Sequence, residues 1–122
     1  MKKRRRKMAS RSYEIGYRFQ RRVKEHMTKL GWNVIIQPKS AFPDMICWRP
    51  IMISEALLFE INAIECKVNK YLNPDEKTKT KEIFLKNRCN RFIVAYRKTK
   101  KLLFYEYKLV NGELVYNDMQ NL

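Results

Sequence analysis

The sequence predicts an α/β protein in which a mixed β-sheet is flanked by helices. Apolar residues make up 45% of the 122 residues, which is enough to form one core in one domain. The chain reads as a helix, three strands, a second helix and further strands, and this order favours a layered arrangement of sheet and helices. The segments typical of strands are residues 32–37, 45–48, 57–68, 92–96, 102–110 and 114–116.

Residues 13–30 have the pattern of an amphipathic helix. Their apolar residues recur at spacings of four and three, and Gly31 follows as a typical helix end. Ahead of this helix, residues 2–7 read Lys-Lys-Arg-Arg-Arg-Lys and have no apolar side chain to bury. We therefore expect residues 1–10 to form a basic, flexible N-terminal arm and residues 11–122 to form a single folded domain.

The first three strands are separated by connections of different kinds. Residues 38–42 are expected to form a loop, and Pro43 is tolerable at the first position of the strand that follows. Residues 49–56 have no clear secondary-structure pattern. Their apolar Ile51-Met52-Ile53 run would belong either to the core or to a dimer contact.

The second helix carries a sequence signal at its start. Asn73 is a favourable N-cap, Pro74 fits the first turn, and Glu76 completes a capping box, so we expect a helix that runs to about Asn87. Near the C-terminus, the dipeptide Asn111-Gly112 predicts a tight hairpin between the last two strands.

The charge of the protein indicates a polyanionic partner. Lys and Arg total 27 against 12 Asp and Glu, giving a net charge of +15. Nucleic acid is the first candidate and an acidic membrane surface the second. The basic residues are spread along the whole chain, which favours nucleic acid. No apolar run is long enough to cross a bilayer and no signal region precedes the domain, so we expect a soluble, cytoplasmic protein.

Cysteine and histidine usage excludes several kinds of site. The three cysteines are widely spaced and lack any Cys-x-x-Cys pairing, which is typical of reduced, buried thiols. His26 is the only histidine. A structural zinc site and catalysis by a Ser-His or Cys-His pair are therefore disfavoured.

The strongest functional signal combines Asp44 with the triplet Glu65-Cys66-Lys67. Asp44 opens one strand after Pro43, and the triplet ends an apolar strand. Side chains alternate along a strand, so Glu65 and Lys67 should point to the same face. Taken singly, a Glu-x-Lys pair is usually solvated and Pro-Asp is a common turn dipeptide. Their combination behind a basic helix favours a nuclease.

Hydrolysis of a phosphodiester needs a metal ion, oxygen ligands for it and a cation near the transition state. Asp44 and Glu65 would be the carboxylate ligands, the carbonyl of Cys66 could add a third oxygen, and such hard ligands suit Mg²⁺ or Mn²⁺. Lys67 would orient the attacking water or stabilise developing charge. Ser40 and Lys39, in the loop before Asp44, could contact the scissile phosphate.

In this order the motifs resemble the PD-(D/E)XK nuclease superfamily, and more closely the archaeal-type Holliday junction resolvases, including those of archaeal viruses. The resemblance covers roughly residues 13–107. It rests on Gly16 and Arg21 in the first helix, Gly31-Trp32-Asn33-Val34 at its end, Ser40-x-x-Pro43-Asp44, Ile64-Glu65-Cys66-Lys67, and Arg91-Phe92-Ile93-Val94-Ala95-Tyr96.

The resemblance implies a restriction-endonuclease-like core and a homodimer that cuts opposed strands of four-way DNA junctions with Mg²⁺, without any other cofactor or a membrane partner. If the protein is viral, it would act in the host cytoplasm. Asp44, Glu65 and Lys67 match the catalytic positions of that family, and Ser40 matches a loop serine that contacts DNA. The basic residues that we expect at the DNA are Lys39, Arg21, Arg18, Arg22, Lys70, Arg4, Arg5 and Arg6.

The sequence departs from that family at Gln20, where the family has a catalytic glutamate. Glu14 and Glu25 lie about 120° and about 140° around a regular helix from Gln20, so neither replaces it. We keep Gln20 among the expected site residues and expect Gln20→Glu to increase cleavage. Two alternatives remain open: a nicking or restriction-like nuclease of the same superfamily, and a DNA-binding protein on a nuclease fold that does not cut.

Overall fold

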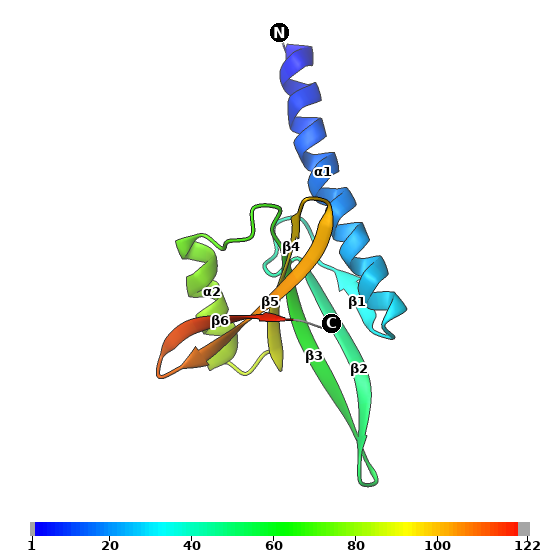
Figure 1. The fold of residues 1–122 in the computed structure, drawn as a ribbon, viewed down its shortest axis with the longest axis vertical. Coiled ribbons are helices and arrows are strands. Elements are labelled where there is room, and N and C mark those ends of the chain that lie inside the picture. The colour runs from blue at the N-terminus through cyan, green and yellow to red at the C-terminus, as the bar shows by residue number, and fades with distance from the viewer. Residues whose placement is uncertain (1, 120–122) are drawn as a thin grey trace.

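The computed structural model describes the backbone of residues 2–119 and the side chains of residues 13–119. Over this range the chain is an α/β protein with two helices and one six-stranded mixed sheet (Figure 1). In chain order the elements are α1 (Lys2–Lys29), β1 (Asn33–Ile36), β2 (Met45–Ile53), β3 (Ala56–Cys66), α2 (Pro74–Leu85), β4 (Arg91–Lys98), β5 (Lys101–Val110) and β6 (Glu113–Met119).

The strands lie in the sheet in the same order as in the sequence. Every neighbouring pair is antiparallel except β3 and β4, which are parallel. A parallel pair needs a crossover connection, and α2 provides it. This crossover starts at the carboxyl end of β3, so it carries the first turn of α2 close to the triplet Glu65-Cys66-Lys67.

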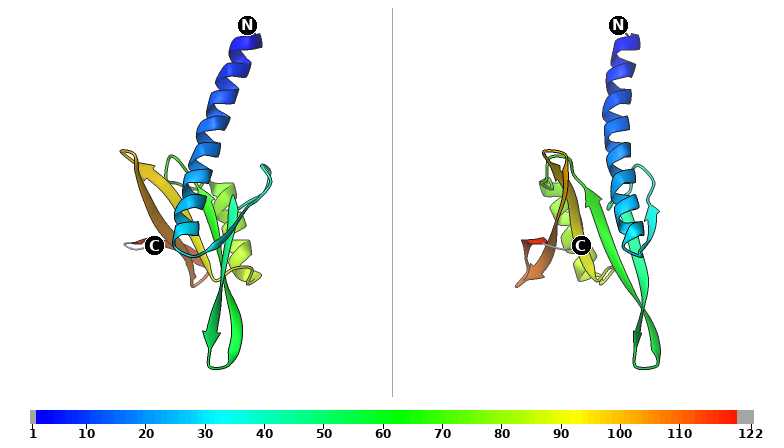
Figure 2. Two further views of the ribbon diagram at one scale, coloured as in Figure 1. Left: turned by 90° about the vertical axis from the view of Figure 1, so that its right-hand side faces the viewer. Right: turned by 45° about the vertical axis from the view of Figure 1, so that its right-hand side comes forward.

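The two helices cover opposite faces of the sheet (Figure 2). On one face, Phe19, Val23 and Met27 of α1 pack against buried strand residues that include Met45 and Ile64. On the other face, α2 packs with a cluster of aromatic and aliphatic residues from the strands, namely Ala63, Phe92, Val94, Tyr96, Tyr105 and Tyr107. Alternate residues of β3 therefore face different helices. No helix in the described part of the chain is long and apolar enough to cross a membrane.

The first helix begins at Lys2 and not at residue 13, so the basic segment that we expected to be a flexible arm lies in the helix. Lys, Arg, Met and Ala are all good helix formers, and a helix that is already nucleated extends at little cost. The amino-terminal part of α1 projects beyond the sheet (Figure 1). Gly31 follows the helix end with φ +95°, as the sequence predicts.

Residues 49–56 are not an irregular connection. They continue β2 and turn back into β3, with Arg49 opposite Glu60 and Ile53 opposite Ala56. The resulting two-stranded hairpin extends below the body of the sheet (Figure 1). Met52 and Ile53 are 63% and 56% exposed, so this run is not part of the core. Pro50 within the segment and the lack of a Gly or Asn turn hid the hairpin from the sequence pattern.

The structure confirms the sequence signals at the start of the second helix and at the last hairpin. Asn73 caps α2 through a complete capping box with Glu76, and Pro74 occupies the first turn. Asn111 and Gly112 both have positive φ between β5 and β6, as a tight hairpin turn requires. The helix ends at Leu85, slightly before the expected position. Cys47 is buried, Cys66 and Cys89 are partly buried, and all three are free thiols.

Candidate active site

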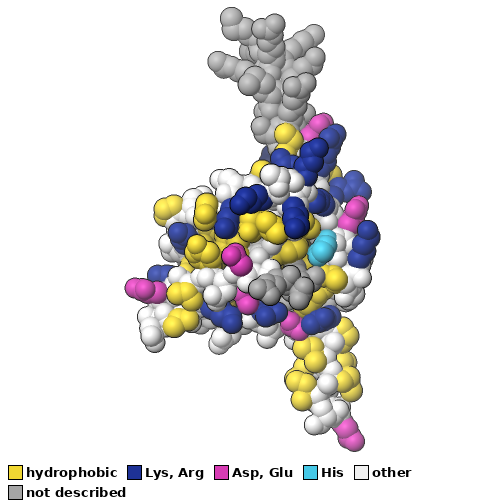
Figure 3. All heavy atoms as spheres, in the orientation of Figure 1, with side chains coloured by type: hydrophobic (Ala, Val, Ile, Leu, Met, Phe, Trp, Pro, Cys, Tyr) yellow, Lys and Arg dark blue, Asp and Glu magenta, His cyan; other side chains and the backbone are white. Residues whose placement is uncertain are grey.

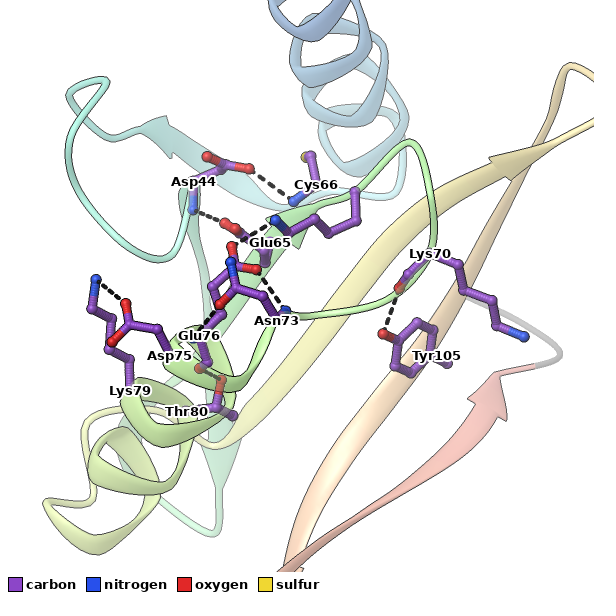
Figure 4. Close-up of polar contacts among 11 residues, drawn as sticks. Asp44, Glu65, Cys66, Lys70, Asn73, Asp75, Glu76, Lys79, Thr80 and Tyr105 are labelled. Atoms are coloured by element: carbon purple, nitrogen blue, oxygen red, sulfur yellow. Dashed lines mark hydrogen bonds and ion pairs between the residues drawn. The ribbon is translucent and has the colours of Figure 1, made fainter.

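The pairing of β2 with β3 places Asp44 beside Glu65. Met45 lies opposite Ile64, so the residue before one strand meets the penultimate residue of the other. The backbone N–H of Asp44 donates to Glu65 Oε1 over 2.9 Å, and the backbone N–H of Cys66 donates to Asp44 Oδ2 over 2.9 Å (Figure 4). Each carboxyl group is thus held by a backbone donor from the other segment.

Lys67 lies on the same face as Glu65, as the alternation of β3 predicts. Its ammonium nitrogen is 2.7 Å from Glu76 Oε2, and both side chains are largely buried, with 23% and 13% of their surfaces exposed. Glu76 is also close enough to Glu65 to help raise the pKa of that carboxyl group. The structure therefore brings together Asp44, Glu65 and Lys67 and adds Glu76 from the second helix.

Sequence reasoning assigned Glu76 to the capping box alone and missed its place in this cluster. The capping role is real, because Glu76 Oε1 accepts the backbone N–H of Asn73 over 2.9 Å. The other carboxylate oxygen is left for Lys67. The signal that could have revealed this is topological: a crossover helix that follows β3 begins at the carboxyl end of that strand, where the triplet lies.

Proximity of the acids changes their ionisation. Glu65 is only 5% exposed, and burial together with the nearby Asp44 and Glu76 raises the pKa of Glu65 to about 10. Partial burial would also raise the pKa of Glu76, but hydrogen bonds from Lys67 and from the N–H of Asn73 outweigh it and lower that pKa. At neutral pH Glu65 is therefore a neutral carboxyl group beside an ionised Glu76.

The oxygen ligands available to a metal are those of Asp44, Glu65 and the Cys66 backbone. In an extended strand the N–H and C=O of one residue point the same way, and the N–H of Cys66 points to Asp44. The Cys66 carbonyl therefore also points toward Asp44. Its side chain instead packs with the core under α1, and burial raises the pKa of that thiol, so its sulfur is not a candidate ligand.

Two carboxyl groups and one carbonyl offer a small set of hard oxygen ligands of the kind that Mg²⁺ or Mn²⁺ takes, and Glu65 would lose its proton when it binds the metal. Within residues 13–119, no three His, Cys, Asp or Glu side chains converge in an arrangement that could hold a metal ion. The candidate metal site thus depends on the backbone carbonyl for its third protein ligand.

Gln20 is not hydrogen-bonded to this cluster among the described contacts. It is on α1, which covers the sheet face opposite to that of Glu65. It instead lines a hollow together with Gln37. Gln37 is the link to the site, because its N–H donates to the carbonyl of Asp44 over 2.8 Å.

Residues 38–40 of the loop before Asp44 are exposed and include Lys39 and Ser40. The N–H of Ala41 donates to the carbonyl of Pro38 and closes a turn there. The ammonium of Lys39 lies 4.6 Å from the centre of the Tyr13 ring, so this loop packs near α1. No described contact joins Ser40 to the carboxylate cluster.

The basic residues expected at DNA are mostly on the surface, and several have partners within the protein. Lys and Arg side chains gather over the upper part of the body beside α1 (Figure 3). Arg18 lies 3.9 Å from Glu14, Arg22 donates to the carbonyl of Lys100, and Lys70 lies over the Tyr71 and Tyr96 rings. Arg21 lies over the Tyr17 ring. The side chains of Arg4, Arg5 and Arg6 fall outside the described residues.

Comparison of the sequence with known proteins gives no match: no protein-family model fits it, and no curated protein matches it significantly.

Proposed function

We propose that this protein is a metal-dependent endodeoxyribonuclease with a restriction-endonuclease-like core that resolves Holliday junctions. The observation that carries the proposal is the cluster at the end of β3, where Asp44 and Glu65 hold each other through backbone N–H groups and Lys67 lies on the Glu65 face. The mixed sheet between two helices is compatible with that core.

Each residue of the cluster has a role in phosphodiester hydrolysis. Asp44, Glu65 and the Cys66 carbonyl would bind Mg²⁺, which when bound polarises the phosphate and lowers the pKa of a water molecule. Lys67 would stabilise negative charge on the phosphate. Glu76 acts on Lys67, because the 2.7 Å contact between them fixes the direction of the ammonium group.

The charge of the protein supports DNA as the substrate. A net charge of +15 gives binding through phosphate neutralisation, and such binding weakens steeply as salt rises. The choice of a four-way junction rests on the order of motifs that resembles the junction resolvases. Cleavage of linear duplex at an equal rate would instead identify a nicking or restriction-like nuclease.

A junction resolvase cuts two opposed strands, so we propose a homodimer. The β2–β3 hairpin offers a surface for it, with Met52, Leu57 and Phe59 more than half exposed. Residues 50–59 contain a single charged residue, Glu55, in a protein that is otherwise strongly basic. Two like-charged copies can approach each other where the positive charge is absent.

The unpaired edge of the hairpin also favours a second copy of this chain as the partner. β1 pairs with β2 only as far as Trp48, so the outer edge of residues 49–53 has no strand partner within the described chain. An exposed apolar edge strand is a template for pairing with another strand. A second copy of this chain can supply one by the same surface, as a two-fold dimer requires.

The test of the enzymatic proposal is cleavage of a four-way junction with Mg²⁺ by wild type and by Asp44→Asn. We expect paired nicks from wild type, a loss of more than about 100-fold in the variant, and unchanged junction binding. Asp75→Asn is the matched control, since Asp75 is an exposed helix residue that pairs with Lys79.

Two results would contradict parts of the proposal. An Asp44→Asn variant that cuts at the wild-type rate would show that the site is elsewhere. Tight binding by wild type with no cleavage of any DNA form in Mg²⁺ or Mn²⁺ would identify a DNA-binding protein that does not cut.

A further inference from the structure

A hollow of about 260 Å³ lies between α1 and the segment that follows β1. Its walls are formed by Tyr13, Gly16, Tyr17 and Gln20 of the helix, by Ile36 at the end of β1, and by Gln37 and Lys39 of the segment. Its volume is just below the roughly 300 Å³ at which pockets for drug-sized ligands begin. The hollow is therefore large enough for one flat ring, and it is open to solvent on one side.

Aromatic rings and cations are arranged around the hollow. The rings of Tyr13 and Tyr17 are nearly parallel, at 10° with centres 6.2 Å apart, and about half of each residue is exposed. Lys39, which lines the hollow, lies over the Tyr13 ring, and Arg21, which lies outside the lining, is over the Tyr17 ring. Exposed aromatic rings beside cations are the arrangement that binds stacked bases and their phosphates in single-stranded nucleic acid.

Gly16 lines the hollow and places no side chain beside it. A Cβ atom added to Gly16 would meet no heavy atom within 4 Å, so the space beside it is open. A glycine inside a helix costs about 0.5–1 kcal/mol of stability relative to alanine. No neighbouring atom is close enough to require a glycine at residue 16. The effect of the glycine is therefore the open space beside it.

The polar groups of the hollow fit the edge of a nucleobase. Gln20 is partly buried and makes no described hydrogen bond, so its amide offers both a donor and an acceptor. The amide nitrogen of Gln37 donates to the carbonyl of Pro43 over 2.7 Å, and this bond fixes that wall. Side-chain amides are well suited to base edges because they pair with a donor and an acceptor at once.

The hollow is next to the candidate active site. Gln37 forms one wall of the hollow, and its N–H is bonded to the carbonyl of Asp44 over 2.8 Å. A strand whose phosphate lies at Asp44 would therefore bring a nearby base to the hollow. Bases within a duplex are stacked and paired, so the base that enters has to be unpaired.

We propose that this hollow binds one unpaired nucleobase of the DNA strand that passes the Asp44–Glu65 cluster, an inference that rests on the proposed action on DNA. Gln20 reads the base edge in this arrangement, because its amide can donate and accept at once, whereas a carboxylate can only accept. The hollow makes the protein favour branched or single-stranded DNA over intact duplex.

Gly16→Ala tests the proposal, because the added methyl group enters the hollow while it improves the helix. The probe is a four-way junction with 2-aminopurine at the branch point, titrated in EDTA so that no strand is cut. We expect a change in 2-aminopurine fluorescence with wild type, its loss with Gly16→Ala, and about tenfold weaker junction binding. The melting temperature of the variant should rise, and duplex binding should not change.

Tyr17→Ala should have the same effect on the fluorescence. Its matched control is Tyr71→Ala, which removes another exposed tyrosine that lies beside a cation but outside the hollow. Unchanged fluorescence and unchanged junction affinity in both Gly16→Ala and Tyr17→Ala would overturn the proposal.

The two proposals fail in distinguishable ways. If wild type cuts junctions and Gly16→Ala alters neither the fluorescence nor the affinity, the base-binding hollow is wrong and the nuclease stands. If wild type cuts no DNA but shows a fluorescence change that Gly16→Ala removes, the nuclease is wrong and the hollow stands.

Discussion

The ammonium of Lys67 lies 2.7 Å from Glu76 Oε2, and this contact joins the end of β3 to the first turn of α2. The same glutamate accepts the backbone N–H of Asn73 with its other oxygen. One side chain thus caps a helix and fixes the lysine of the candidate site, so the start of the helix and the geometry of the site depend on each other.

We expect Glu76→Gln to weaken the protein and its activity. Glutamine keeps the capping interaction, so the variant removes mainly the charge that Lys67 contacts. Loss of a charged, largely buried partner should lower the free energy of unfolding by about 2 kcal/mol and reduce cleavage about tenfold or more. Urea unfolding and junction cleavage measure the two effects.

Glu82→Gln is the matched control, because Glu82 pairs with Lys86 over 3.5 Å on the exposed surface of the same helix. An exposed pair of this kind contributes less than about 0.5 kcal/mol. Equal effects of the two substitutions would show that the Lys67–Glu76 contact has no special role.

Glu65 should destabilise the metal-free protein as pH rises. Its folded pKa of about 10 lies above its ordinary value, so the proton it retains contributes stability that is full below about pH 4.5 and is lost as pH rises through about 10. Glutamine stays neutral in both states. We therefore expect Glu65→Gln to melt higher than wild type at pH 8 without metal, and at a similar temperature at pH 4.

Added Mg²⁺ should reverse that order. It should raise the melting temperature of wild type, because binding to the folded state alone stabilises it, and should have little effect on Glu65→Gln. Thermal melts at several pH values, with EDTA or with Mg²⁺, measure both effects. Parallel pH profiles for the two proteins would contradict the raised pKa of Glu65.

Asn62 is a second buried polar residue, and its replacement should stabilise the protein. It is 1% exposed, and neither its side-chain oxygen nor its nitrogen has a hydrogen-bond partner among the described residues. A buried polar group without a partner costs about 1–3 kcal/mol. Asn62→Leu should therefore raise the free energy of unfolding by that order, as measured in urea.

The smaller Asn62→Val variant separates polarity from crowding, and Asn117→Leu on exposed β6 is the control with no expected effect. Loss of stability in both Asn62 variants would mean that the amide is hydrogen-bonded in solution.

The β2–β3 hairpin should hold the dimer together. Leu57→Lys places a charge on the apolar surface of the β2–β3 hairpin. We expect this variant to be a monomer where wild type is a dimer, with little change in melting temperature. Light scattering after size exclusion reports the mass. Val115→Lys is the control, because it adds the same charge at an exposed position on β6. A wild-type monomer at all concentrations would contradict the assignment.

Local chemistry explains which elements could be predicted from the sequence. The Asn73–Glu76 capping box and the Asn111-Gly112 turn are set by neighbouring residues, so both were predicted at the right positions. The length of α1 was underestimated, because apolar periodicity marks only the part of a helix that packs. The hairpin was missed because its strands extend past the core, where neither burial nor a glycine turn marks them.

The candidate site was predictable to the same extent. Glu65 and Lys67 followed from strand alternation, and Asp44 from its place at the start of a strand. Asp44 lies beside Glu65 because of the register of β2 with β3. Glu76 lies beside Lys67 because the crossover begins at the end of β3. Both are long-range relationships, which a pattern in one sequence does not contain.

The order of elements has a consequence for how such a protein can diversify. The clustered residues Asp44, Glu65, Lys67 and Glu76 lie between positions 44 and 76, whereas the residues that line the hollow lie between positions 13 and 39. The two groups are consecutive blocks of chain that touch at Gln37 and Asp44. Under the two proposals, exchanging the residues of the first block that line the hollow would change the choice of substrate, while the core residues Phe19, Val23 and Met27 and the proposed cutting residues stay in place.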